Sequence, residues 1–422
     1  MLSDAEVLLG LSRHLSAYAM NPSTAALEQL SFAGWVYEMA WRLRGSGASS
    51  PERVEAIALE ARISRRRLLV DVLPTLETLG WVSVQRKADN TLHAVVEVIP
   101  PPTELLGLAE SVLEVAMPTA TERSALTLLR ATTLQPLEVT AALEEASPHG
   151  DVAARDALRH LVAIKLVRRI KADDGREVVF NPNIWADNPK VIEAALRAED
   201  ARIRAEVGAL LEEVVASPGL PESQVSSTDQ PWIDFAVAHG LVQRTVVQTT
   251  EGAEHGFLFS PHLNRDPFGA GTTDPSGHVR QLVGSMVYAA TFPRFKLWSP
   301  VKFVRALVRD GEAGDASPIG TDYPMLETAG IVRIVPGSAM DRYRFELLQS
   351  EVAEEALTIL EKRGGSNTEG DNEAGLRTQR SYVHLERERA RLAVDVPVDD
   401  TEQARLIAAL RDSTARRRYS GF

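Results

Sequence analysis

The sequence predicts a mainly α-helical protein with small β-hairpins (class α+β), built from four tandem modules that are joined by helices and followed by a helical C-terminal tail. Two observations support this prediction. The phrase LETLGWV at residues 76–82 returns as LETAGIV at residues 326–332, and both combine a helix end, a glycine and the start of a strand. Prolines precede helical segments at spacings of 85, 85 and 79 residues, at Pro51, Pro136, Pro221 and Pro300. Because proline is favoured at the first helical position, this near-constant period indicates an internal repeat.

Each repeat, here called a unit, has the predicted order helix, helix, helix, hairpin. A helix with apolar periodicity comes before the proline, as in FAGWVYEMAWRLRG from Phe32 and VRQLVGSMVYAAT from Val279. A second helix starts at the proline. A third helix ends at the glycine junction, which is replaced by Lys165 in unit 2 and comes early, at Gly240, in unit 3. Two alternating apolar runs around a polar turn then predict a β-hairpin.

Changes in composition set the predicted domain boundaries. The domains are residues 1–102 (an N-terminal helix and unit 1), 103–188 (unit 2), 189–266 (a long helix and a degenerate unit 3), 275–362 (unit 4), 363–380 (a linker) and 381–422 (a helical tail). The segment GGSNTEGDNEAG is low in apolar residues and predicts a flexible linker. Three consecutive arginines at residues 416–418 give the tail a basic end.

The composition limits the function classes. The 422-residue chain has a net charge of −12 and no cysteine, so thiol chemistry, disulfides and cysteine-based zinc fingers are excluded. Any nucleic-acid contact must come from a local basic patch. No apolar run has the length of a membrane span, and the N-terminus lacks the basic region of a signal peptide. Together with an Arg-rich, Lys-poor composition, these features predict a cytoplasmic bacterial protein with no membrane contact.

The order helix, helix, helix, hairpin resembles the winged helix-turn-helix domain, in which the third helix usually reads DNA and the hairpin is the wing. The resemblance covers roughly residues 30–362 and rests on this architecture without a signature motif. It implies four tandem winged-helix-like modules, and double-stranded DNA as a partner of at least one of them.

Unit 1 carries the residue types that a DNA-reading winged helix needs. The candidate DNA-binding residues lie at the start of its third helix and on its hairpin: Ser64, Arg65, Arg66, Arg67, Gln85, Arg86 and Lys87. Cations beside a helix N-terminus add to the positive field of its free N–H groups, which favours a phosphate. The alternative is a solvated face in which the arginines pair with Glu60, Asp71 or a neighbouring unit; the DNA interpretation is preferred.

The other units are less suited to DNA. Secondary candidates in unit 2 are Arg155, Arg159, Arg169 and Lys171, whose charge is offset by nearby aspartates. Unit 3 has no Lys or Arg from residue 205 to 243, and unit 4 has none from residue 310 to 330. Phosphate would be repelled there, so we expect units 3 and 4 to contact a protein partner or to self-associate.

The sequence contains no motif with a catalytic mechanism. It lacks a phosphate loop, HExxH, GxSxG and a strand-linked GxGxxG. The Arg-x4-His spacing of RDALRH, at residues 155–160, lies inside a predicted helix and is interpreted as chance. His255 and His262 flank a strand without a third ligand, so neither a metal site nor a cofactor is expected.

These observations lead to one leading hypothesis and one alternative. The leading hypothesis is a non-enzymatic DNA-binding protein, either a transcriptional regulator or a DNA-associated accessory factor, that reads duplex DNA through unit 1. The alternative is a tandem winged-helix scaffold subunit of a multi-protein complex, of the chromosome-organisation or defence type, without direct DNA readout. DNA binding predicts a positive patch shared by the third helix and the hairpin of unit 1, whereas the scaffold predicts that those arginines are buried in contacts within the chain or with a partner.

Overall fold

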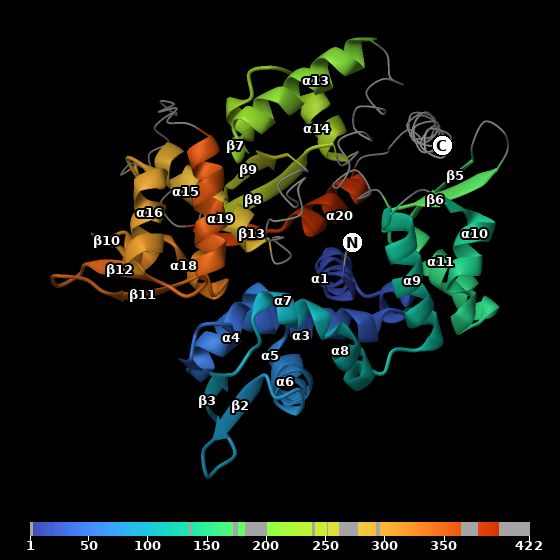
Figure 1. Ribbon diagram of the computed structural model, residues 1–422, viewed down its shortest axis with the longest axis horizontal. Helices are drawn as coiled ribbons and strands as arrows, with labels where there is room; N and C mark the ends of the chain where they lie inside the picture. Colours follow the sequence, from blue (N-terminus) through green and yellow to red (C-terminus); the bar gives the residue numbers. More distant parts are fainter. Residues whose placement is uncertain are drawn as a thin grey trace, which may run out of the picture.

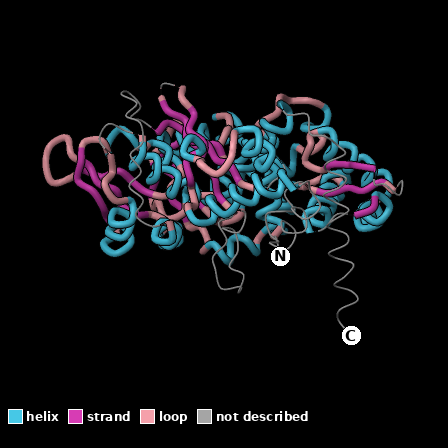
Figure 2. Tube along the Cα trace, turned by 90° about the horizontal axis from the view of Figure 1, so that it is seen from above, coloured by secondary structure: helices cyan, strands magenta, loops and turns pink. Residues whose placement is uncertain are grey.

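The protein is mainly helical, with four small antiparallel sheets distributed among the helices (Figure 1). The computed structural model describes residues 3–134, 137–171, 176–181, 201–238, 241–250, 252–260, 277–292, 296–363 and 379–395. In Figure 2 the strands are spread along the length of the molecule, with helices between them. The predicted α+β class is therefore confirmed.

Unit 1 is built around a three-stranded sheet with the order β1-β3-β2. Its elements are α3 (Glu28–Leu43), β1 (Ala48–Ser49), α4 (Pro51–Glu60), α5 (Arg65–Arg67), the π-helix η1 (Leu68–Val72), α6 (Leu73–Thr78), β2 (Val82–Arg86) and β3 (Leu92–Glu97). They follow α1 (Asp4–Leu15) and the short α2 (Pro22–Ala25). Leu76 and Trp81 of the phrase LETLGWV are buried in the core, where Trp81 packs against Tyr37. Burial of these two aromatic rings accounts for the position of the third helix against α3.

Unit 2 repeats this arrangement with the sheet order β4-β6-β5. The linking helices α7 (Pro102–Gly107) and α8 (Ala109–Ala116) lead to α9 (Ala120–Leu134), β4 (Leu137–Glu138), α10 (Val139–Ala146), the 3-10 helix η2 (Ser147–His149), α11 (Asp151–Ala163), β5 (Arg168–Lys171) and β6 (Glu177–Phe180). Pro136 lies outside the described residues, and α10 begins after β4. The buried apolar residues of units 1 and 2 form one continuous cluster.

Unit 3 has a fourth strand that comes from the far end of the chain. Its elements are α13 (Ala201–Ala216), β7 (Leu220–Pro221), the 3-10 helix η4 (Glu222–Gln224), α14 (Gln230–Ala238), β8 (Gln243–Thr249) and β9 (Glu254–Phe259). The added strand β13 (Gln379–Val383) pairs antiparallel with β8, with Tyr382 opposite Val247, and gives the order β13-β8-β9-β7. The sequence predicted a helix at Pro221, which is wrong because this residue belongs to β7.

The C-terminal tail begins differently from the prediction. A helix, α20 (Leu385–Asp395), is present in the segment predicted to be helical. Residues 381–383, however, belong to strand β13, because their backbone pairs with the open edge that β8 presents in the unit 3 sheet. The predicted linker, apart from residues 363, 379 and 380, and the basic end at residues 416–418 lie outside the described residues.

Unit 4 shares the sheet topology of the other units, but its proline stands at a different place in the order of helices and strands. Its elements are α15 (His278–Thr291), α16 (Pro300–Asp310), β10 (Glu312–Ala316), α17 (Ile319–Asp322), α18 (Pro324–Thr328), β11 (Val332–Pro336), β12 (Tyr343–Leu347) and α19 (Ser350–Lys362). In all four units the short strand pairs with the second strand of the hairpin. Pro300 opens the helix before the short strand, whereas Pro51 opens the helix after it.

The proline spacing is thus not a structural period. Both helices share the same local start, with a serine N-cap whose hydroxyl accepts a backbone N–H and a proline at the first helical position. This local chemistry suits the start of any helix, so it cannot mark the phase of a repeat. The helix at Val279, predicted as the first of unit 4, is α15, which precedes the unit's equivalent of α3.

The four units surround α1 and α20, which contact each other (Figure 1). Unit 4 is docked on unit 1 through the second copy of the repeated phrase. Gln349 donates hydrogen bonds from Nε2 to the carbonyl oxygens of Trp41 (2.9 Å) and Gly330 (3.0 Å), and Arg42 donates to the carbonyl oxygen of Thr328 (3.3 Å). Gly330 has a left-handed backbone (φ +71°), and a Cβ there would lie 1.9 Å from the carbonyl oxygen of Arg42. Only glycine allows the two units to approach this closely.

The two glycines of the repeated phrase offer a matched test of this docking. Gly80 has nearly the same backbone (φ +74°) as Gly330, but a Cβ there meets nothing within 4 Å. We expect Gly80→Ala to lower the free energy of unfolding by about 1–2 kcal/mol, the usual cost of a left-handed alanine. Gly330→Ala should cost roughly a further 1–3 kcal/mol, because the methyl group collides with α3. Urea unfolding of both variants measures the difference, and equal costs would contradict the docking.

Candidate nucleic-acid interface

The start of the third helix of unit 1 is fixed by local interactions. After α4 the chain turns through Arg62, which has a left-handed backbone (φ 61°), and buries Ile63. The Ser64 side chain then accepts a hydrogen bond from the backbone N–H of Arg67 at 3.3 Å, as an N-cap does. The first turn of the third helix therefore consists of Arg65, Arg66 and Arg67, the three arginines predicted to contact DNA.

A π-helical segment interrupts the third helix directly after these arginines. The backbone N–H of Leu73 bonds to the carbonyl oxygen of Leu68, five residues earlier. Pro74 cannot donate a hydrogen bond, and its ring would collide with the carbonyl four residues before it in a regular α-helix. The wider turn of η1 absorbs that conflict, so the helix continues to Thr78 without a break.

The three arginines differ in how strongly the protein holds them. Arg65 is 72% exposed and pairs with Glu55 at 2.8 Å. Arg66 is exposed and has no hydrogen bond or ion pair with any described residue. Arg67 is half-exposed and pairs with Glu28 and, at 3.1 Å, with Asp71; the hydrogen bond that its guanidinium donates to the Asp71 carboxylate is the first cause of its raised pKa. The expected pairing with Asp71 is present, so the third helix combines one unpaired arginine with two paired ones.

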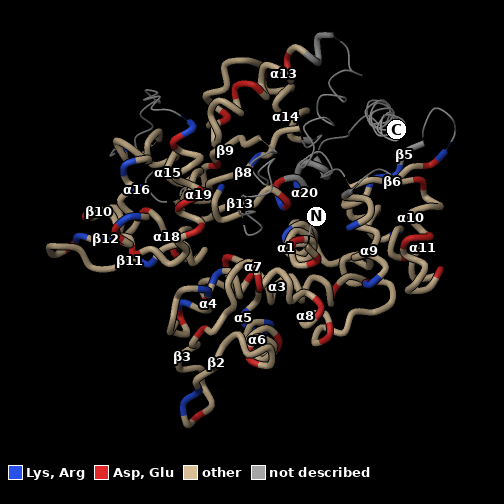
Figure 3. The backbone as a smooth tube through the Cα atoms, in the orientation of Figure 1, with Lys and Arg blue, Asp and Glu red and all other residues tan. Residues whose placement is uncertain are grey.

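The hairpin of unit 1 projects away from the body of the molecule (Figure 1). Gln85 and Arg86 lie at the end of β2, Lys87 starts the turn, and all three side chains are exposed. The turn is closed by a hydrogen bond from the Lys87 N–H to the Thr91 carbonyl oxygen (2.9 Å) and by Asn90 in the left-handed region. Figure 3 shows the basic residues at the end of this hairpin, next to an acidic residue. This geometry leaves the cations accessible to a ligand.

Two of the four secondary candidates in unit 2 are paired with acidic side chains. Arg155 is exposed on α11, and Arg159 pairs with Asp156 at 3.0 Å. Arg169 pairs across the hairpin with Glu177, and Lys171 ends β5. The acidic partners sit on the same helix or hairpin as the arginines, so this surface offers little net positive charge to a phosphate.

The third helix of unit 4 is covered by unit 1. α18 contacts α4, and Glu327 in α18 pairs with Arg53 in α4 at 3.3 Å. Next to this contact, Arg333 on β11 donates a hydrogen bond to the carbonyl oxygen of Ser46. The segment that corresponds to the arginine-bearing helix of unit 1 is therefore used for contacts within the chain.

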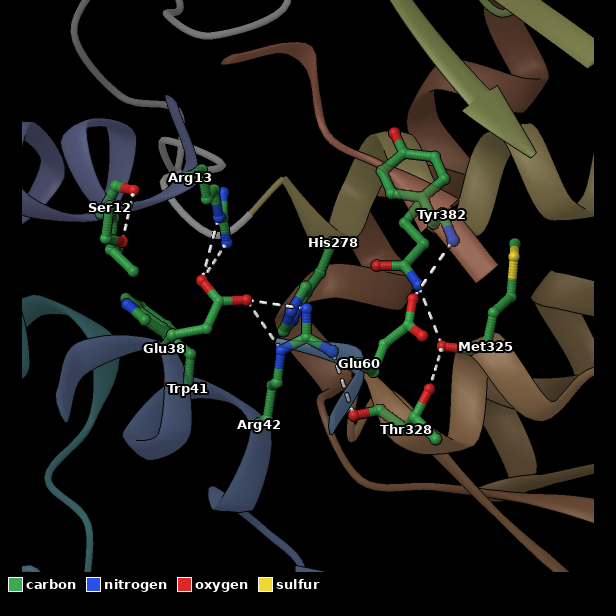
Figure 4. A network of polar contacts seen from close by, with 12 residues as sticks. Ser12, Arg13, Glu38, Trp41, Arg42, Glu60, His278, Met325, Thr328 and Tyr382 are labelled. Atoms are coloured by element: carbon green, nitrogen blue, oxygen red, sulfur yellow. Dashed lines mark hydrogen bonds and ion pairs between the residues drawn. The ribbon is translucent and has the colours of Figure 1, made fainter. Parts of the chain in front are cut away.

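The sequence analysis missed a buried charged cluster between the units. The Glu38 carboxylate on α3 forms two ion pairs (Figure 4). Its Oε2 lies 2.7 Å from the guanidinium of Arg13 on α1, and its Oε1 lies 2.7 Å from the guanidinium of Arg42 on α3. All three side chains are buried. Burial alone would raise the pKa of Glu38, but the guanidinium groups of Arg13 and Arg42 outweigh it and lower the pKa to about 2. One signal was present in the sequence: Glu38 and Arg42 stand four residues apart in the otherwise apolar run from Phe32 to Leu43.

Comparison with known proteins finds no family model, no curated protein and no solved structure that matches this chain. Within the described ranges, no helix is long and apolar enough to cross a membrane. Among those same residues, no three His, Asp or Glu side chains gather in a way that could hold a metal ion.

Replacement of Glu38 tests the buried cluster through its pH dependence. Glu38→Gln leaves two buried arginines without their anion, which should destabilise the fold by roughly 3–5 kcal/mol at pH 7. Because the folded pKa of about 2 lies below the ordinary value of 4.5, the stability from Glu38 is present above pH 4.5 and is lost as pH falls toward 2. The difference in free energy of unfolding between wild type and Glu38→Gln, measured by urea unfolding, should therefore become smaller as pH falls below 4.5. A gap that stays constant from pH 7 to pH 3 would show that Glu38 is not held as a carboxylate.

Proposed function

We propose that the protein binds double-stranded DNA through unit 1 and acts without catalysis, as a transcriptional regulator or a DNA-associated accessory factor. One observation carries the proposal. Arg65 and Arg66 at the start of the third helix, and Arg86 and Lys87 on the projecting hairpin, are exposed on the same unit. In a winged helix-turn-helix domain these two elements are the reader helix and the wing.

The element order of unit 1 supports this assignment of roles. Helix, short strand, helix, helix and hairpin, with the short strand paired to the second hairpin strand, is the arrangement that resembles a winged helix. Unit 4 has the same sheet topology, but its third helix lies against α4. Unit 1 is therefore the better candidate for DNA, and unit 4 serves to hold the chain together.

The ion pairs of unit 1 set the expected strength of binding. The side chains of Arg66, Arg86 and Lys87 form no hydrogen bond or ion pair with a described residue, so they can contact phosphate without breaking one. Three such contacts predict a slope of about −3 when the logarithm of affinity is plotted against the logarithm of salt concentration. If Arg65 and Arg67 also leave their carboxylates and contact phosphate, the slope should steepen to about −4 to −5. Binding should be modest and strongly salt-dependent.

A second function is favoured by a different observation. Leu59 on α4 is 74% exposed and Val70 on η1 is 62% exposed, both on the helices that a winged helix presents to its ligand. Aliphatic side chains on such a surface suit a protein partner. The alternative is therefore a scaffold subunit of a multi-protein complex, in which unit 1 docks on protein and the arginines meet acidic side chains.

Fluorescence anisotropy with a generic labelled duplex, from about 50 to about 300 mM salt, tests the DNA proposal. The test variant carries Arg66→Gln, Arg86→Gln and Lys87→Gln, which break no ion pair between described residues. The matched control carries Lys302→Gln, Arg305→Gln and Arg309→Gln on α16, which change the net charge by the same amount. We expect wild type and control to bind with the steep salt slope and the test variant to lose binding.

Two outcomes would contradict the proposal. One is that folded wild-type protein does not bind the duplex at the lowest salt concentration, which would favour the scaffold. The other is an equal loss of affinity in the test variant and the control, because the attraction would then come from total charge and not from unit 1.

A further inference from the structure

A cavity lies between unit 1 and the C-terminal segment that carries β13 and α20. Its walls come from α1, α3, the turn between α4 and α5, and the segment around His384. It is partly open, and the volume available to the centres of water-sized molecules is about 30 Å³, whereas one water needs roughly 10–15 Å³. The cavity can therefore admit a group larger than one water through its mouth. It is called the C-terminal cavity below.

The lining of the C-terminal cavity is unbalanced in charge. Its inner part holds the cluster in which Arg13 and Arg42 share Glu38. Its outer part holds a second set of the same composition, in which Arg62 and Arg387 flank Glu60. Four guanidinium groups therefore face two carboxylates. Glu386, outside the lining, lies 4.0 Å from Arg13 and offsets only part of the excess.

The side chains of the outer arginines make no direct polar contact within the described part of the chain. Neither the Arg62 nor the Arg387 side chain forms a hydrogen bond or ion pair there, and the Nε of Arg387 is buried. Burial and the positive charge of Arg62 lower the pKa of Arg387, and the negative charges of Glu60 and Glu388 offset part of that shift. The Glu60 carboxylate instead accepts the backbone N–H of Tyr382 at 3.3 Å. Arg62 also adopts a left-handed backbone, which is uncommon for a residue other than glycine, asparagine or aspartate. A buried guanidinium nitrogen without a hydrogen bond, such as the Nε of Arg387, is costly unless a ligand supplies the acceptor.

His384 adds a neutral hydrogen-bonding group to the same wall. Its side chain is only 8% exposed, and its Nε2 has no hydrogen-bond partner. Burial, and then the positive charges of Arg13, Arg42, His278 and Arg280, lower its pKa well below the ordinary value. The charges that lower the pKa of this ring indicate a positive potential at the cavity wall.

We propose that the C-terminal cavity binds a small oxyanion, either inorganic phosphate or the phosphate group of a small metabolite, through Arg62, Arg387 and His384. Phosphate oxygens match the planar fork of guanidinium donors, and an imidazole nitrogen supplies a further hydrogen bond. The anion would neutralise the excess of two positive charges among the lining residues. It would also connect the turn before the third helix of unit 1 to the segment that pairs with the unit 3 sheet. This inference does not depend on DNA binding.

Isothermal titration calorimetry with inorganic phosphate, and separately with adenosine monophosphate, tests the proposal on the full chain. The variants are Arg387→Gln and Arg62→Asn, the second chosen because asparagine tolerates a left-handed backbone. Arg305→Gln on α16 is the control, since Arg305 is an exposed arginine far from the cavity lining. We expect one saturable site in wild type and control, weakened about tenfold or more in each cavity variant.

The two ligands distinguish the sources of the oxyanion. Equal affinity for both points to free phosphate or to the phosphate group alone, and tighter binding of adenosine monophosphate points to a phosphorylated metabolite. Absence of a saturable site for either ligand in folded wild-type protein would overturn the proposal. Binding that survives in both Arg387→Gln and Arg62→Asn would overturn it as well, because the anion would then sit elsewhere.

Discussion

The arrangement of the units depends on one buried carboxylate. Glu38 is shared by Arg13 and Arg42, and Arg42 also donates to the carbonyl oxygen of Thr328 in unit 4. A single anion therefore joins the N-terminal helix, the first helix of unit 1 and the third helix of unit 4. Because buried charges are tolerated only when they are paired and hydrogen-bonded, each of these elements is held in one position relative to the others. The neighbouring hydrogen bonds of Gln349 reinforce that position.

This constraint explains why one repeated phrase has two structural roles. Gly330 lies against the carbonyl oxygen of Arg42, whereas nothing lies within 4 Å of the matching Cβ position at Gly80. The third helix of unit 4 packs against α4, and its Glu327 forms an ion pair with Arg53 of that helix. The third helix of unit 1 faces away from this contact and keeps its cations exposed. A repeat has thus been divided into one copy that contacts the chain itself and one copy that is available for a ligand.

Local features could be predicted from the sequence, whereas non-local ones could not. Helix starts at Pro51 and Pro300, the hairpins and the cap at Ser64 depend on neighbouring residues, so periodicity and turn chemistry identified them. The repeat boundaries predicted from the prolines were wrong because proline suits the start of any helix. Strand β13 was not predicted because its partner β8 lies more than a hundred residues away in the sequence. The seven candidate residues of unit 1 were selected by residue type and by their expected place on the third helix and hairpin, but the pairing of Arg67 with Glu28 and of Arg65 with Glu55 was not predicted. The cavity at Arg62 and Arg387 is formed by four segments that are separate in the sequence, and no sequence pattern indicates it.

Amide hydrogen exchange with and without saturating duplex DNA tests the division between units 1 and 4 most directly. If unit 1 is the DNA-contacting copy, protection should appear in residues 64–72 and 82–92, the third helix and the hairpin. Residues 324–336, the docked counterpart in unit 4, should already exchange slowly and should not change. Equal new protection in residues 324–336, or none in unit 1 under conditions where DNA is bound, would contradict the account.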